Sequence, residues 1–127
     1  MNINKIFYFD ANEMRVLLNN GVVELNNAEV GILNLLLSEN KIYSKNEIFT
    51  YAWEYNYRLH SSVVHQAISQ LRKKFYRYNI EIIITERNKG YRINKLYVYK
   101  YMHRSLYVKY KFKTKIALAH MLNKHRF

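Results

Sequence analysis

The chain has 127 residues, half of them hydrophobic, so it can build the core of one domain with room for an extension. It contains 21 Lys and Arg against 9 Asp and Glu, and this net charge of +12 points to a polyanionic partner, either nucleic acid or an anionic membrane surface. The absence of cysteine excludes disulfides, thiol catalysis and Cys-based zinc sites. The longest uncharged apolar run, residues 30–37, is too short to span a bilayer, so we expect no membrane span.

The charge divides the chain into two parts. Residues 1–94 carry 12 Lys and Arg against 9 Asp and Glu, whereas residues 95–127 carry 9 Lys and Arg and no acidic residue. The alternating helix and strand patterns end at the same place. We therefore predict a folded domain over residues 1–94 and a basic, aromatic-rich C-terminal extension over residues 95–127.

The first 26 residues predict a small antiparallel β-sheet. Residues 5–9 and 15–18 are β-rich runs, and the turn-like residues 10–12 separate them. A hairpin is expected at Asn19-Asn20-Gly21, which stands between two apolar runs. Asn-Gly in this position is typical of a type I′ turn, in which both central residues have positive φ.

Three helices are predicted next. The first runs from about residue 27 to residue 39, capped by Asn26 or Asn27 and with Glu29 in its first turn. The second begins at Ser44, where residues 44–47 have the sequence of a capping box. The third runs from residue 61 or 62 to residue 78.

The third helix has one apolar face and one polar face without an acidic residue. At 100° per residue, the apolar face consists of Val64, Ala67, Ile68, Leu71, Phe75 and Tyr78. The opposite face consists of Ser62, Gln66, Ser69, Gln70, Lys73 and Arg77. Such a face is either an ordinary solvated surface or a groove-binding one, because amides pair with base edges and cations reach phosphates.

Two short strands, residues 80–85 and 91–93, follow with a polar hairpin tip between them. A helix, a turn, a helix and a basic β-hairpin are the layout of a winged helix-turn-helix. The predicted fold class is therefore α+β: a winged helix-turn-helix with an N-terminal antiparallel β-sheet, three helices and a C-terminal β-hairpin wing, plus the basic extension.

Four segments in unbroken order resemble the OmpR/PhoB-type winged-helix DNA-binding domain. They are Val23-Glu24-Leu25 with Glu29, Tyr43-Ser44-Lys45 with Trp53, residues 67–75, and residues 84–93, of which the last is the most diagnostic. The similarity covers about residues 5–94. It implies that the third helix enters the major groove of double-stranded DNA and that the wing enters the adjacent minor groove.

The resemblance also implies roles for single residues. The base-reading candidates are Gln66, Ala67, Ser69, Gln70 and Arg87. The phosphate-contacting candidates are Trp53, Ser62, Arg72, Lys73, Lys74, Arg77, Thr85, Asn88 and Lys89. A loop over residues 54–60 would contact RNA polymerase through Tyr55, Tyr57 and Arg58.

The chain departs from the family pattern in three ways. Many relatives carry arginine at the positions of Ser69 and Gln70, and the wing lacks a second glycine near Asn88. No phosphoacceptor receiver domain precedes the winged helix, an arrangement similar to that of ToxR-type regulators. The resemblance then implies a stand-alone bacterial transcription regulator, or a relative that has lost its sensor half, binding DNA as a homodimer in the cytoplasm, at the nucleoid. The Asn-, Lys-, Ile- and Tyr-rich composition is compatible with an AT-rich gene, such as that of a virulence regulator.

The extension leaves a second function open. Val108, Tyr110 and Phe112 alternate with four lysines at residues 109, 111, 113 and 115. With so many tyrosines, we expect the extension to pack on the domain or on a second copy. It could be an arm on the DNA backbone, a dimerisation element or a packing element. The alternative function is a non-specific RNA-binding or architectural protein driven by this extension.

Nothing in the sequence predicts catalysis. The pairs His60/His65 and His120/His125 are spaced i, i+5, which does not place two metal ligands on one helical face. The chain has three glycines and no phosphate-loop pattern, nucleophile elbow or paired carboxylates. We predict no enzymatic activity, no cofactor and no metal.

Overall fold

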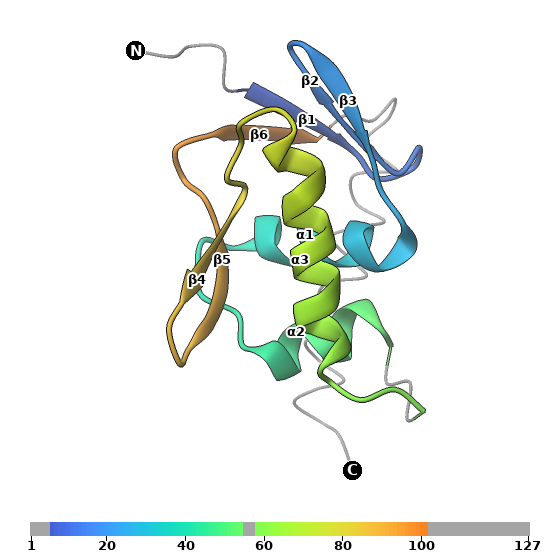
Figure 1. Cartoon of the computed structure of the whole chain (residues 1–127), viewed down its shortest axis with the longest axis vertical. Coiled ribbons are helices and arrows are strands. Elements are labelled where there is room, and N and C mark those ends of the chain that lie inside the picture. The colour runs from blue at the N-terminus through green and yellow to red at the C-terminus, as the bar shows by residue number, and fades with distance from the viewer. Residues whose placement is uncertain (1–5, 55–57, 102–127) are drawn as a thin grey trace.

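The computed structural model describes residues 6–54 and 58–101, which form an α+β winged helix (Figure 1). The elements in chain order are β1 (Ile6–Asp10), β2 (Arg15–Leu18), β3 (Gly21–Glu24), α1 (Asn27–Ser38), α2 (Lys45–Ala52), α3 (Val63–Tyr76), β4 (Ile83–Glu86), β5 (Gly90–Ile93) and β6 (Val98–Tyr101). The sheet of β1, β2, β3 and β6 lies at one end of the molecule, α3 runs lengthwise, and the β4–β5 hairpin lies beside it. The predicted fold class is confirmed.

The N-terminal sheet has the strand order β3-β2-β1-β6. The three N-terminal strands are antiparallel, as expected, but β6 joins β1 in parallel, with Ile6 opposite Val98 and Phe9 opposite Tyr101. The sheet therefore includes residues from the stretch predicted as an extension. Periodicity cannot reveal this pairing, because the two strands lie at opposite ends of the described chain.

Tyrosines attach the last strand to the core. The ring of Tyr97 stacks on Phe7 with centroids 4.9 Å apart, and the ring of Tyr99 meets Phe7 edge-on at 5.5 Å. The Tyr99 hydroxyl donates to the carbonyl of Asn94 over 3.0 Å, and Tyr101 packs on Phe9. The expected packing of the tyrosines on the domain is thus met for these three residues, and the others lie outside the described part of the chain.

The β2–β3 hairpin is confirmed, but the predicted type I′ turn is wrong. Leu18 pairs with Gly21, so the loop is Asn19-Asn20, and neither asparagine has positive φ. Gly21 instead leaves room for the ring of Tyr78, which would have to shift if a Cβ stood there, and the Tyr78 hydroxyl donates to the carbonyl of Val22. The glycine therefore permits close approach of the residues that follow α3.

The helix ends follow the predicted caps. Asn26 caps α1 and Ser44 caps α2, each in a capping box with a glutamate at the third helical position. Helix α3 is shorter than predicted, because the chain turns after Tyr76 and Asn79 adopts a φ of 58°. Within residues 6–54 and 58–101, no helix is long and apolar enough to cross a bilayer.

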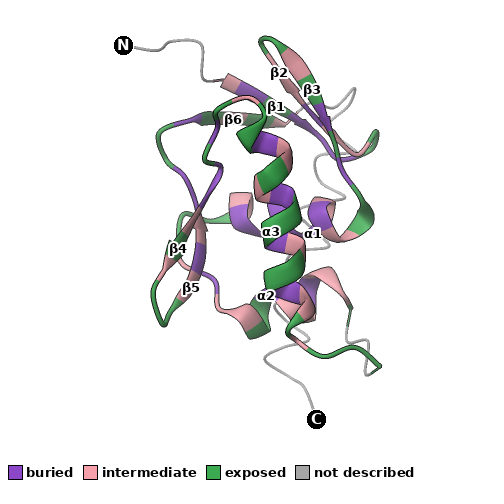
Figure 2. Ribbon diagram, in the orientation of Figure 1, coloured by how far each residue is buried: buried purple, intermediate pink, exposed green. Residues whose placement is uncertain are grey.

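The core lies between the three helices and the inner face of the sheet (Figure 2). From α3 it takes Val64, Ile68, Leu71 and Phe75, as the apolar stripe predicts, whereas Ala67 and Tyr78 are half-buried. Because one side of α3 is held by this packing, its opposite side faces outward along most of its length.

A buried carboxylate ties α3 to the start of α1. Glu29 is fully buried, and its Oε1 accepts from the Nζ of Lys74 over 2.6 Å and from the backbone N–H of Asn26 over 2.9 Å. Lys74 also donates to the carbonyl of Glu24 over 2.9 Å. The Glu29 Oε2 has no hydrogen-bond partner, so the lysine is the cation that compensates this charge.

Replacing Lys74 should therefore destabilise the fold far more than replacing its neighbour. Lys74→Met leaves the Glu29 carboxylate buried without a cation, and we expect a loss of about 3 kcal/mol in the free energy of unfolding. Lys73→Met, one position away and exposed, should change it by no more than about 0.5 kcal/mol. Urea unfolding followed by circular dichroism measures both. Equal losses would show that the ion pair is not important.

Candidate nucleic-acid interface

The outward face of α3 is polar, exposed and free of acidic side chains. Gln66, Ser69, Gln70, Lys73 and Arg77 are all exposed, with Ser62 at the helix start. No acidic residue occurs in α3, whose last turn holds Lys73 and Lys74. The amides and hydroxyls come first and the cations follow. Hydrogen-bonding groups of this kind match base edges, and the cations match phosphates.

The wing is a tight hairpin with a basic tip. Glu86 pairs with Gly90, and the exposed tip consists of Arg87, Asn88 and Lys89. The backbone N–H of Lys89 donates to the Glu86 carbonyl over 2.9 Å, and Asn88 has a φ of 63°. Asparagine tolerates this left-handed conformation, so the turn closes without the second glycine that the family pattern has.

Gly90 is a position that only glycine can fill. Its φ is 143°, and a Cβ there would collide with the carbonyl of Tyr43. Tyr43 and Tyr91 exchange two backbone hydrogen bonds of 2.8 and 2.9 Å, which attach the wing to the segment before α2. The close approach of the two backbones fixes the position of the wing relative to the segment before α2.

Tyr91 also joins the wing to α3. Its hydroxyl hydrogen-bonds to the Nδ1 of His65, and the guanidinium of Arg72 lies over its ring, 5.7 Å from the centroid. Burial raises the pKa of Tyr91 and the nearby Arg72 lowers it, with burial the larger effect, so the hydroxyl stays protonated at neutral pH. Arg72 in addition donates to the carbonyl of Ile83 over 3.1 Å and to the Oγ1 of Thr85 over 2.5 Å. Arg72 and Thr85 thus bind each other across the helix–wing junction.

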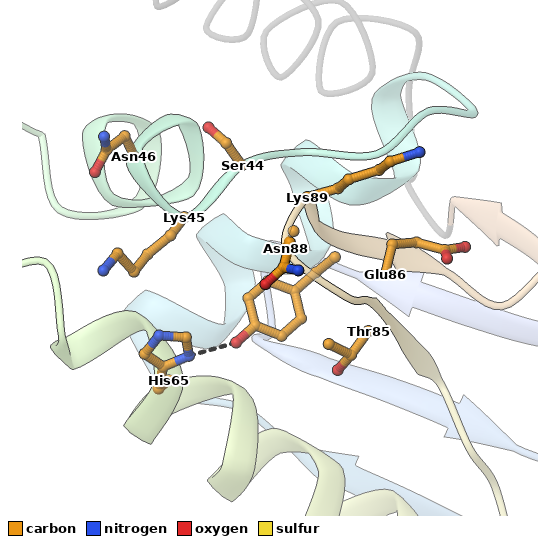
Figure 3. Close-up of a pocket in the computed structure, with 10 residues that line it drawn as sticks. Ser44, Lys45, Asn46, His65, Thr85, Glu86, Asn88 and Lys89 are labelled. Carbon is orange, nitrogen blue, oxygen red and sulfur yellow. Dashed lines mark hydrogen bonds between the residues drawn. The ribbon is translucent and has the colours of Figure 1, made fainter.

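A cavity of about 450 Å³ opens between the wing, α3 and the start of α2 (Figure 3). Lys45, His65, Asn88 and Lys89 line it, and the dashed line in Figure 3 marks the hydrogen bond between His65 and the hydroxyl of Tyr91. The acidic member, Glu86, is bound to Arg92 over 2.5 Å. The rim therefore presents lysines and neutral polar groups.

Some predicted residues lie away from this surface. Lys74 is directed at the buried Glu29, and Trp53 stacks on Phe49 at the end of α2, where it lines a different cavity. Arg58 is exposed, and Tyr55 and Tyr57 lie outside the described residues. Among the residues that the structure describes, no cluster of His, Asp or Glu could hold a metal ion.

The structure adds three residues to the candidate surface: Lys45, His65 and Tyr91. His65 is four positions before Ser69, so the helical period could have placed it beside the outward face. Lys45 and Tyr91 lie at this surface because the backbones of Tyr43 and Tyr91 pair with each other. These residues are far apart in the sequence, so no local pattern predicts the pairing.

Solved structures share this fold. The DNA-binding domain of Escherichia coli CadC has a TM-score of 0.59 and 20% identity, covering 66% of this chain and 81% of that one. The DNA-binding domain of the response regulator AdeR, solved in complex with an intercistronic region, has a TM-score of 0.61 and 22% identity, covering 74% and 97%. The DNA-binding domain of Bacillus subtilis CssR has a TM-score of 0.55 and 26% identity, covering 63% and 90%. No curated protein matches.

The sequence itself identifies the family. The family described as "Transcriptional regulatory protein, C terminal" matches residues 20–93, which run from the β2–β3 turn to the end of the wing. The match spans more than half of the chain and includes α3, both strands of the wing and the Tyr43–Tyr91 junction. The chain therefore belongs to this family of OmpR/PhoB-type winged-helix DNA-binding domains of transcription regulators.

Proposed function

We propose that the chain is a sequence-specific transcription regulator that inserts α3 into the major groove and the wing tip into the adjacent minor groove. The observation that carries this proposal is the acid-free outward face of α3 beside a basic hairpin tip. A solvated helix face normally mixes glutamate with lysine, whereas this one has no carboxylate to repel phosphate and bears cations toward its C-terminal end. Acting on DNA, the protein would work in the cytoplasm, at the nucleoid.

The proposed roles follow the positions of the side chains. Gln66, Ser69 and Gln70 contact base edges, with Ala67 beside them, and Arg87 enters the minor groove. Phosphates are bound by exposed groups at the two ends of α3 and on the wing: Ser62, Lys73, Arg77, Asn88 and Lys89. Lys45 and His65 extend this set across the cavity.

Arg72, Thr85 and Lys74 take different roles in this proposal. Arg72 and Thr85 hold the wing at its angle to α3, because their side chains bind each other. Lys74 supports the fold through Glu29. Trp53 lines a cavity at the end of α2 whose described lining includes no residue of α3 or the wing, so this proposal gives it no phosphate contact.

The family resemblance supports two protein partners. A homodimer would bind two half-sites, and the loop that contains Arg58 would contact RNA polymerase. The competing function, non-specific binding to RNA or DNA through the basic C-terminal residues, predicts no preference between sequences. A competition titration separates the two: a promoter fragment should outcompete bulk DNA by at least about 10³-fold at physiological salt. Equal competition by bulk DNA or RNA would favour the non-specific protein.

Gln70→Ala should remove a base contact. An amide can pair bidentately with adenine, so we expect a loss of about 1–3 kcal/mol on the best site and relaxed preference at one base position. Lys73→Ala is the matched control on the next turn of the same face. It should weaken specific and random DNA alike and lower the slope of log K against log salt by about 1. If Gln70→Ala loses the same affinity for specific and for random DNA, Gln70 does not contact a base.

Arg87→Ala should weaken binding most at sites with flanking A-tracts. A narrow A·T-rich minor groove has an enhanced negative potential that attracts an inserted arginine. Fluorescence anisotropy on two duplexes that differ in the flank alone measures the effect, with Lys89→Ala as the neighbouring control. If Arg87→Ala weakens both duplexes equally, the wing tip is not inserted.

Arg72→Lys should weaken DNA binding without removing a charge. The Nη2 of Arg72 donates to both the Ile83 carbonyl and Thr85 while the planar guanidinium lies over the Tyr91 ring. The compact ammonium of lysine cannot reproduce this combination, so the wing should lose its fixed angle. We expect about a tenfold loss of affinity on the best site and an unchanged salt slope. If Arg72 instead binds phosphate, Arg72→Lys should cause only a small loss of affinity, and Arg72→Gln should reduce the slope of log K against log salt.

A further inference from the structure

A second cavity, of about 630 Å³, lies on a part of the domain that the proposed interface does not use. It opens between the β1–β2 turn, the start of α1 and the end of α2. Among the described residues, none lines both this cavity and the wing cavity. Met14, Val30 and Trp53 give it an apolar wall, and Glu54 adds a carboxylate. An apolar cavity with a few polar groups is typical of a binding site.

The cavity contains a buried acceptor without a donor. Asn34 lines it and is 2% exposed. The Asn34 Nδ2 donates to the hydroxyl of Tyr51 over 2.8 Å, but its Oδ1 has no hydrogen-bond partner. Buried side-chain acceptors in folded proteins almost always have a donor, so the Asn34 Oδ1 favours an occupant that brings an N–H or O–H group into the cavity.

The last described strand directs the chain toward this cavity. Strand β6 runs parallel to β1, with Tyr101 opposite Phe9. Continued in the same direction, the chain would come beside Asp10 and Ala11, and Ala11 lines the cavity. At about 3.3 Å per residue, one or two residues are enough to cover that distance.

The residues that follow have side chains suited to this cavity. Residues 102–106 are Met-His-Arg-Ser-Leu, which combine two apolar side chains with several N–H donors. We propose that residues 102–106 dock in the cavity of their own molecule, with a donor on the Asn34 Oδ1 and apolar side chains against Trp53.

Cysteine pairs in the full-length chain test this proposal against a clean background, because the natural sequence has no cysteine. Ser105→Cys is combined either with Ala28→Cys, in the cavity, or with Tyr8→Cys, which is exposed on the outer face of the sheet opposite Lys100. Under mild oxidation we expect the Ala28 pair to form an intramolecular disulfide at least about tenfold faster, because disulfide formation requires close Cα atoms. Non-reducing electrophoresis and mass spectrometry follow the products.

Three outcomes would overturn the proposal. A faster reaction of the Tyr8 pair would place the segment on the sheet face, and equal rates would mean that it has no fixed place. A covalent dimer through the Ala28 pair would mean that the occupant comes from a second copy.

Trypsin cleavage after Arg104 gives an independent measurement on chains without cysteine. Ala28→Arg places a long cation in the cavity and should raise the cleavage rate at least about tenfold, since it displaces the segment. Val22→Arg, at an exposed position on β3, should leave the rate unchanged. Circular dichroism checks that both variants are folded. Unchanged cleavage in a folded Ala28→Arg variant would overturn the proposal.

Discussion

The reciprocal backbone hydrogen bonds between Tyr43 and Tyr91 hold together the parts of the molecule that would meet DNA. They attach β5 to the segment that leads into α2, and this contact requires glycine at position 90. Because the backbone of Tyr91 is fixed there, its side chain reaches α3. Its hydroxyl hydrogen-bonds to His65, and the guanidinium of Arg72 lies over its ring. The angle between wing and helix thus depends on a contact in which neither the wing tip nor the outward face of α3 takes part.

The cations of α3 illustrate how one short run of charge serves two purposes. Lys73 and Lys74 are adjacent in the sequence but lie 100° apart around the helix axis. Lys73 faces outward, whereas Lys74 compensates a buried glutamate 45 positions earlier in the chain. A positive charge near the C-terminal end of a helix also interacts favourably with the helix dipole, so both lysines suit their place along α3.

Local patterns predicted most of the fold, and contacts distant in sequence account for the differences. The helix caps, the N-terminal hairpin and the apolar stripe of α3 depend on residues close together in the sequence, and they were found where expected. The parallel pairing of β6, the binding of Lys74 to Glu29 and the binding of Arg72 to Thr85 depend on partners 13 or more residues away. The candidate surface was also predicted only in part. The helical period distinguishes the outward residues of α3 from the buried ones, but it cannot show which cations already bind other groups of the protein.

Strand β6 has a consequence for the order in which the domain is completed. Strand β1 lies between β2 and β6, so it obtains its second neighbour only after about 90 further residues have been synthesised, a long loop to close. Until then, the backbone of β1 along Phe7 and Phe9 is an open edge that another chain could pair with. On the ribosome, the helices and the wing can fold before the sheet is complete. A nascent chain that stalls before Val98 would therefore carry a nearly finished winged helix with an aggregation-prone edge.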